Sequence, residues 1–125
     1  MSAYTITAAT DVPDVLGDYP GEMHMLTMGM DSEQVAFTYR RMPPQGGYGH
    51  SHKTQEEVYF VISGTLQFKL GDEIVDVGPY TAVRIAPATV RSVWNEGPGD
   101  VELVMCSPRG DTREDVVKHE GFWPE

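Results

Sequence analysis

Short apolar segments, separated by turn residues, follow one another along most of this chain of 125 residues. Valine, isoleucine, tyrosine, phenylalanine and threonine recur in these segments, and such side chains favour extended strands. We expect strands at residues 4–7, 24–30, 35–42, 57–62, 65–70, 73–77, 82–85, 90–95 and 101–106. Turn signals recur between them about every 8–12 residues, and this spacing is typical of an all-β sandwich or barrel.

Turn-forming residues also mark the segments without a strand pattern. Residues 11–21 are rich in proline, glycine and aspartate and are expected to form a loop, as are residues 43–49. Gly71 and Asp72 are expected to form a hairpin turn between two neighbouring strands. The 13 glycines and 9 prolines of the chain favour many short strands over long helices.

The C-terminal segment has a different pattern. Thr112 is suited to cap a short helix that runs through Lys118, and Gly121 is suited to end it. Phe122 and Trp123 would then pack either on the barrel or on a partner subunit, and the pattern leaves both open. The expected architecture is therefore an all-β barrel with a short C-terminal helix or tail.

Length and composition favour one domain over residues 1–125, because a chain of this size buries a core without disulfides. Cys106 is the only cysteine, so a reducing compartment is expected, and the cytoplasm with it. The N-terminus lacks the pattern of a signal peptide, and no apolar run reaches the length of a membrane span. The net charge of −10 disfavours nucleic acid as a partner, because like charges repel.

Two histidines and a glutamate form the candidate site. Side chains two residues apart on an extended chain point the same way, so His50 and His52 project together. Glu57 opens the next expected strand after a turn, and its carboxylate can face back toward the two imidazoles. Two histidines and one carboxylate on one face are the set that holds Fe(II), Mn or Zn with open positions.

The same segment resembles the first motif of the cupin family, over about residues 44–64. In that motif two histidines one residue apart are followed by a glutamate and, six residues later, by a glycine. His50, His52, Glu57 and Gly64 match these four positions. Glu57 is preferred over Glu56 because only Glu57 leaves six residues before the glycine.

The second cupin motif is similar to residues 80–95 in spacing, although its residue types are mostly changed. Its glycine, proline, glycine, histidine and asparagine positions fall on Tyr80, Ala86, Ala88, Arg91 and Asn95 in turn, and only the asparagine keeps the family's residue type. The resemblance covers roughly residues 41–107 and implies a double-stranded β-helix. It also implies a small-molecule ligand and a homodimer, since small cupin barrels pair.

Arg91 stands where metal-binding cupins supply a third histidine. Arginine stays protonated and has no lone pair, so it cannot coordinate a metal. A divalent Fe, Mn, Ni or Zn ion therefore remains one alternative, with Arg91 turned away or an anion between. The other is a metal-free site in which Arg91 pairs with Glu57 through two parallel hydrogen bonds. No other cofactor is indicated.

Three functions remain open at this point. One is a metal-dependent enzyme, such as a dioxygenase or isomerase, that uses His50, His52 and Glu57. A second is a metal-free isomerase or cyclase, in which His50 or His52 is the general base and Arg91 stabilises an oxyanion. The third is a binding module without catalysis. Arg91 is also expected to anchor a carboxylate or enolate of the ligand, and Tyr59, which shares the parity of Glu57, to contact it.

Overall fold

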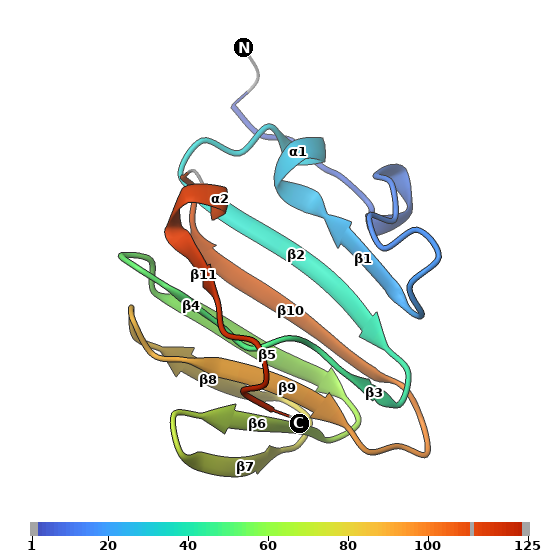
Figure 1. The fold of residues 1–125 in the computed structure, drawn as a ribbon. Helices are drawn as coiled ribbons and strands as arrows, with labels where there is room; N and C mark the ends of the chain where they lie inside the picture. Colours follow the sequence, from blue (N-terminus) through green and yellow to red (C-terminus); the bar gives the residue numbers. More distant parts are fainter. Residues whose placement is uncertain (1–2, 111, 124–125) are drawn as a thin grey trace.

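Two antiparallel sheets face each other in the computed structural model, which describes residues 3–110 and 112–123, leaving aside the side chains of 112 and 113 (Figure 1). The first sheet has the order β1 (Glu22–Met25), β2 (Val35–Met42), β10 (Val101–Pro108), β5 (Glu57–Ser63) and β8 (Thr81–Ile85). The second has the order β11 (Val116–Lys118), β4 (His50–His52), β9 (Arg91–Asn95), β6 (Leu66–Leu70) and β7 (Glu73–Val77), with β3 (Gln45–Gly46) paired to β9. The predicted all-β class is confirmed.

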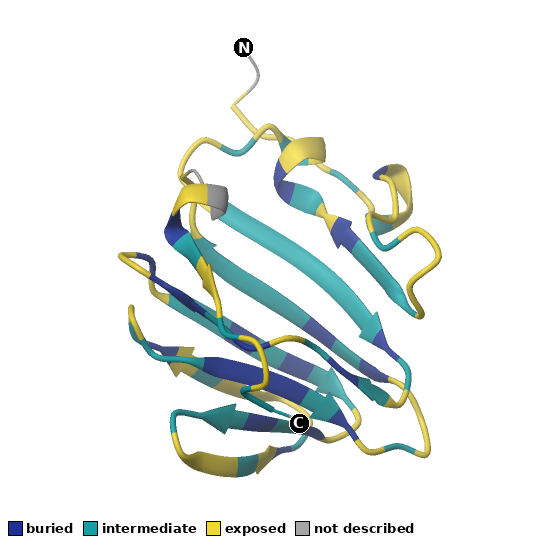
Figure 2. Cartoon of the chain, viewed as in Figure 1, coloured by how far each residue is buried: buried dark blue, intermediate teal, exposed yellow. Residues whose placement is uncertain are grey.

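Alternate residues of the strands form the core between the sheets. The buried cluster consists of Met42, Tyr59, Val61, Leu66, Phe68, Val77, Ile85, Val93, Val101 and Leu103. In β5 and β6 the buried side chains are two residues apart, as a pleated strand with one face toward the core requires. Figure 2 shows the buried residues gathered on the inner strands, above all β9, while β7 at the sheet edge is largely exposed.

The central strands lie where the pattern predicts them, within one or two residues. The bounds of β2 and β7 are the predicted ones, and β5, β6, β8, β9 and β10 differ only at their ends. Gly64 separates β5 from β6 with φ of 81°, and a Cβ there would lie 2.9 Å from the Asp100 carbonyl oxygen. Glycine is therefore required at this turn.

The N-terminal predictions are wrong in two places. Residues 4–7 form no strand, and a short 3-10 helix, η1 (Ala9–Asp11), follows them. The expected strand at 24–30 is divided into β1 and a helix, α1 (Leu26–Met30). The Thr27 hydroxyl accepts a hydrogen bond from the Phe37 N–H at 2.7 Å, so a side chain replaces the strand ladder there. Tertiary contacts thus outweigh the local strand pattern.

Two further segments differ from expectation. The proline-rich loop at 43–49 contains β3, which pairs with Asn95 and Trp94 of β9. The expected helix through Lys118 is only the short α2 (Thr112–Asp115), and the chain then continues as β11 along β4. The backbone groups of β11 form their hydrogen bonds with β4, whereas in a longer helix they would have formed them within the helix. No helix of the described residues is long and apolar enough to span a membrane.

Candidate functional site

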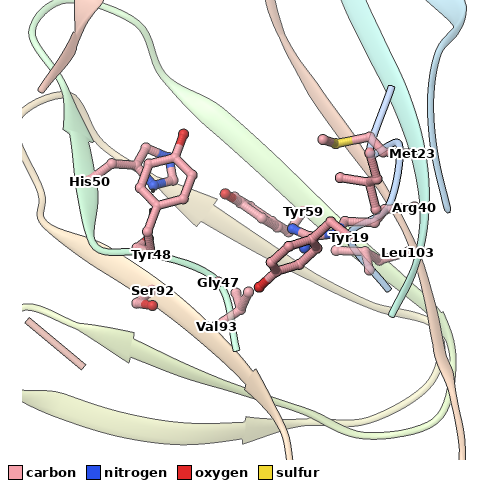
Figure 3. A pocket seen from close by; sticks show the side chains of 11 residues that line it. Tyr19, Met23, Arg40, Gly47, Tyr48, His50, Tyr59, Ser92, Val93 and Leu103 are labelled. Atoms are coloured by element: carbon pink, nitrogen blue, oxygen red, sulfur yellow. Dashed lines mark hydrogen bonds between the residues drawn. The ribbon is translucent and has the colours of Figure 1, made fainter. Parts of the chain in front are cut away.

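Two adjoining cavities, of about 370 Å³ and about 350 Å³, lie between the sheets. They share Met23, Arg40, Tyr48, His50 and Tyr59, so they form two lobes of one hollow. The tyrosine lobe is completed by Leu16, Tyr19, Gly47, Ser92, Val93 and Leu103 (Figure 3). The histidine lobe is completed by Met25, Ala36, Thr38, His52, Glu57, Met105, Ser107 and Val116.

The three predicted ligand side chains meet in the histidine lobe. One ligand atom each from His50, His52 and Glu57 lies within 4.8 Å of the other two. His50 and His52 alternate along β4, and the hydroxyl of Ser51 between them lies 3.0 Å from Nε2 of His119. Because Glu57 begins β5 of the facing sheet, the carboxylate reaches the two imidazoles across the hollow.

His50 is a neutral imidazole at neutral pH. Burial, together with the charge of Arg91 opposite it on β9, lowers the pKa of His50 to about 4. Its Nδ1 lies 3.4 Å from the Tyr48 carbonyl oxygen, which can only accept a hydrogen bond. The tautomer with its proton on Nδ1 therefore donates to Tyr48 and leaves the Nε2 lone pair free.

His52 lies between two carboxylates. Its Nε2 is 3.9 Å from Glu57 Oε1, and its Nδ1 is 3.3 Å from Asp115 Oδ2, although the latter two atoms are not aligned as a hydrogen bond. Hydrogen bonds from the Thr54 hydroxyl and from the N–H groups of Gln55 and Thr54 lower the pKa of Asp115. The ionised Asp115 thus favours a proton on Nδ1 of His52 and leaves Nε2 toward the hollow.

Sequence reasoning missed Asp115, since an aspartate 63 positions after His52 carries no local motif. The only sequence signal for a functional carboxylate in this segment is the acidic cluster from 111 to 115, and such a cluster is equally typical of a solvated surface.

Arg91 is fully buried behind Glu57. Its Nη2 donates one hydrogen bond of 3.2 Å to Glu57 Oε1, and its Nη1 donates one of 2.8 Å to the Thr89 carbonyl oxygen. The expected pair of parallel hydrogen bonds to Glu57 is therefore wrong in this structure, because the guanidinium divides its donors between two acceptors. Arg91 is absent from the lining of both lobes.

Tyr59 and Arg40 line both lobes from neighbouring strands. Burial, and then the negative charge of Glu57, raises the pKa of Tyr59, so its hydroxyl stays protonated. Arg40 extends from β2 toward Tyr19 and Tyr59, with Tyr48 and His50 across the lobe (Figure 3). Burial lowers the pKa of Arg40, and its buried Nε has no hydrogen-bond partner.

Arg40 and Arg41 are neighbours on one strand, so their side chains face opposite sides of the sheet, and the sequence does not show which of the two faces inward. The strand register decides between them: Arg41 faces outward and pairs with Glu22 at 3.0 Å and Asp100 at 2.7 Å. Arg40 therefore shares the inward face with Met42, which is fully buried.

The family description "Cupin domain" matches residues 38–107, more than half of the chain. The chain belongs to the cupin family. No curated protein matches it.

Solved structures show the same fold at low identity. A cupin protein from Bacteroides fragilis has a TM-score of 0.72 at 18% identity, over 90% of this chain and 89% of that one. The polyketide cyclase RemF from Streptomyces resistomycificus has a TM-score of 0.76 at 17% identity, over 97% of this chain and 87% of that one. Streptomyces PAC13, solved with uridine, has a TM-score of 0.76 at 16% identity, over 96% of this chain and 93% of that one.

Residues of the second motif of this cupin stabilise the backbone of neighbouring turns. The Asn95 amide donates hydrogen bonds of 2.9 Å to the carbonyl oxygens of Met42 and Gly99, and its oxygen accepts one of 2.8 Å from the Gly97 N–H. Tyr80 and Ala88, at two of the family's glycine positions, have φ of 58° and 67°. The cupin backbone therefore keeps its left-handed turns although the glycines are gone.

The donor set of this cupin fits a divalent transition metal. Two imidazole nitrogens and one carboxylate are ligands for Fe, Mn, Ni or Zn, and they leave positions open for a substrate. His50 is neutral, and the Asp115 carboxylate, 3.3 Å from Nδ1 of His52, favours the tautomer whose Nε2 can bind a metal. The charge of Arg91 opposes a cation, but Glu57 lies hydrogen-bonded between Arg91 and the histidines.

Proposed function

We propose that this cupin is an enzyme for a small molecule and that His50, His52 and Glu57 hold a divalent transition metal. The observation that carries the proposal is the convergence of the three ligand atoms, within 4.8 Å of one another, on a hollow large enough for a small ligand. A bound metal would supply Lewis-acid catalysis or oxygen activation, as in dioxygenase-like or isomerase-like enzymes.

The surrounding residues prepare this site. Asp115 keeps the Nε2 atom of His52 toward the hollow, and Arg91 holds the Glu57 carboxylate in place. We therefore assign Arg91 a positioning role, while direct contact of Arg91 with a substrate stays a prediction. The protonated hydroxyl of Tyr59 can donate a hydrogen bond to a substrate oxygen, and we keep Tyr59 as a substrate-binding residue.

Metal analysis tests the proposal directly. Protein purified without a histidine tag and reconstituted with Fe, Mn, Ni or Zn should hold about one equivalent of metal. His52→Ala should lose it, while His119→Gln, a matched change of a histidine outside the group, should retain it. Substoichiometric metal that does not rise on reconstitution would contradict the proposal, as would equal metal content in the two variants.

A second candidate, a metal-free isomerase or cyclase, is supported by the buried cation next to Glu57. Arg91 already neutralises the carboxylate, so the site has no electrostatic need for a metal. His52 would then be the general base, oriented by Asp115, and Arg91 would stabilise an oxyanion that reaches it past Glu57.

Proton exchange separates the two candidates. Deuterium uptake from D2O by enolisable carboxylates such as phenylpyruvate should survive chelation if His52 is a metal-free base, and it should disappear in His52→Ala. Exchange that needs added metal favours the first candidate. If a ligand stabilises the protein but is returned unchanged, with no exchange in either state, the chain is a binding module instead.

We further propose that the protein is a cytoplasmic homodimer. The largely exposed edge strand β7 leaves backbone groups open for pairing with a second copy, which supports association of two barrels. Light scattering at micromolar concentration should give twice the mass of the chain, and a monomer would contradict the proposal.

A further inference from the structure

Arg40 lacks the partner that every other arginine with a described side chain has. Arg41 pairs with Glu22 and Asp100, Arg84 with Glu56, and Arg91 with Glu57, while Arg109 donates to the Ser32 carbonyl oxygen. Among the arginines whose side chains the structure describes, Arg40 alone makes no hydrogen bond or ion pair. The Arg40 side chain nevertheless lines both lobes of the hollow, where the residue is half-buried and its Nε is buried.

An unpartnered charge in such a place is costly. Removing a guanidinium from water disfavours the charged form, and an ion pair or hydrogen bonds normally offset that cost. The titratable groups that act on Arg40 electrostatically are the phenol groups of Tyr59, Tyr19 and Tyr48, and none of them is a carboxylate. The protein alone thus leaves one positive charge without compensation.

The charges around the hollow identify the class of ligand that would compensate it. Glu57 is the only carboxylate among the described residues that line the two lobes, and it is already matched by Arg91. No lysine is among the described residues that line either lobe, so the metal-free hollow has a surplus of one positive charge. A monoanion balances this charge, whereas a dianion such as phosphate would leave a buried negative charge behind.

We infer that Arg40 binds the carboxylate of a monoanionic ligand whose apolar or aromatic body lies in the tyrosine lobe; this inference rests on the proposed function and names its substrate class. The planar guanidinium fork matches a carboxylate through two parallel hydrogen bonds. Tyr19, Tyr48 and Tyr59, with Leu16, Val93 and Leu103, provide a mainly apolar surround for the rest of the ligand.

The two lobes determine the orientation of this ligand. Arg40 and Tyr59 border both lobes, and His52 and Glu57 line only the histidine lobe. A carboxylate held by Arg40 therefore leaves the opposite part of the ligand free to extend across the tyrosine lobe toward His50, which lines both lobes. In this arrangement Arg40 selects the substrate, and the histidine lobe carries out the reaction.

Replacement of Arg40 by methionine separates binding from folding. Arg40→Met keeps most of the side-chain length and removes the uncompensated charge, so the ligand-free variant should unfold about 2–6 °C above the wild type. A structural arginine would give the opposite shift. Arg41→Met, on the next residue of β2, is the matched control and should unfold at or below the wild-type temperature, because it loses two ion pairs.

Titration calorimetry with benzoate and its neutral analogue benzamide tests the ligand class. Wild-type protein and Arg41→Met should prefer benzoate to benzamide by about tenfold or more, a free-energy difference typical of one charge-assisted pair. Arg40→Met should lose this preference, and Arg40→Lys should recover part of it. Benzene-1,2-dicarboxylate, a dianion, should bind more weakly than benzoate to the metal-free protein.

Three results would overturn the inference: no benzoate binding at millimolar concentration, equal binding of benzoate and benzamide by the wild type, or unchanged benzoate affinity in Arg40→Met. The proposed function fails separately. If the metal proposal is wrong, benzoate still binds and metal does not. If the ligand proposal is wrong, Arg40→Met and wild type hold metal equally, and neither distinguishes benzoate from benzamide.

Discussion

At the residue scale, Ala88 and Tyr80 hold backbone conformations that suit glycine. Both have a positive φ, where the Cβ atom of an L-residue crowds the following carbonyl group. Both side chains are exposed, so their packing does not repay this cost. The strain is local to the second motif, in which only Asn95 keeps the family's residue type.

Ala88→Gly should therefore stabilise the protein, by about 1 kcal/mol. The N–H of residue 88, which donates to the His52 carbonyl oxygen at 2.6 Å, remains in the variant. Urea unfolding measures the change. Ala82→Gly, in the exposed part of strand β8, is the control and should destabilise by about 0.5–1 kcal/mol, since glycine only adds freedom to the unfolded chain there. Destabilisation by both changes would contradict this prediction.

Asp115 is the second residue with a specific expected effect. Asp115→Asn keeps the shape of the side chain but removes the negative charge 3.3 Å from Nδ1 of His52. Because such carboxylates fix the orientation and basicity of a ligating imidazole, metal affinity should fall by about 10–100-fold. Competition with a chromophoric chelator measures it. Asp111→Asn, in the same acidic cluster, serves as the control, and equal affinity in Asp115→Asn and wild type would contradict the role.

At the element scale, the edge strand β11 pairs along the outer edge of β4, and we call residues 116–118 the C-terminal strap. Three residues pair with His50, Ser51 and His52, and the ladder is extended by the Lys53 N–H to the Asp115 carbonyl oxygen and the His119 N–H to the Gly49 carbonyl oxygen. β4 has only one pair, His50 with Arg91, on its other side. The strap therefore contributes most of the backbone pairing that keeps the two histidines in place.

Val117→Pro should loosen this strap without disturbing the core. The alternation of the antiparallel ladder makes Val117 and Ser51 a hydrogen-bonded pair, and proline removes its N–H. The side chain itself is exposed, so little packing is lost. Metal affinity should fall by about tenfold or more, while the unfolding temperature changes by only a few degrees. Val117→Thr should match the wild type, and the same metal affinity in the proline variant would contradict the role of the strap.

At the scale of the whole molecule, two ionised carboxylates fasten segments near the two chain ends to the barrel. Asp14 accepts hydrogen bonds of 3.0 Å from the N–H groups of Leu16 and Met23, close to the loop that supplies Leu16 and Tyr19 to the tyrosine lobe. Asp115 holds the C-terminal strap through Thr54 and Gln55. Hydrogen bonding lowers the pKa of both carboxyls from 3.8.

The protein should therefore lose stability in acid. A carboxyl whose pKa is lower in the folded state adds stability above its unfolded pKa of 3.8, and this stability is lost as the pH falls through the lower folded value. Asp14→Asn should be less stable than the wild type at pH 7, and the difference should shrink below about pH 4. Urea midpoints from pH 7 to pH 2.5 measure it, with Asp72→Asn in the β6–β7 turn as control. A difference that stays constant over this range would contradict the prediction.

The sequence by itself determined the positions of the central strands along the chain and the three converging side chains of the candidate metal site. Both depend on short-range geometry: alternation along a strand with a period of two places His50 and His52 together, and Gly64 ends β5. Such signals lie within a few residues of one another.

Tertiary structure decided what depends on neighbours distant in the chain. The division of residues 24–30 into β1 and α1 follows from a side-chain contact with Phe37, and the β11 strand follows from pairing with β4. Whether Arg40 or Arg41 faces inward is set by the register of β2 against β1 and β10, because either arginine satisfies the local pattern. The unpartnered charge, and with it the expected class of ligand, exists only once the sheets enclose it.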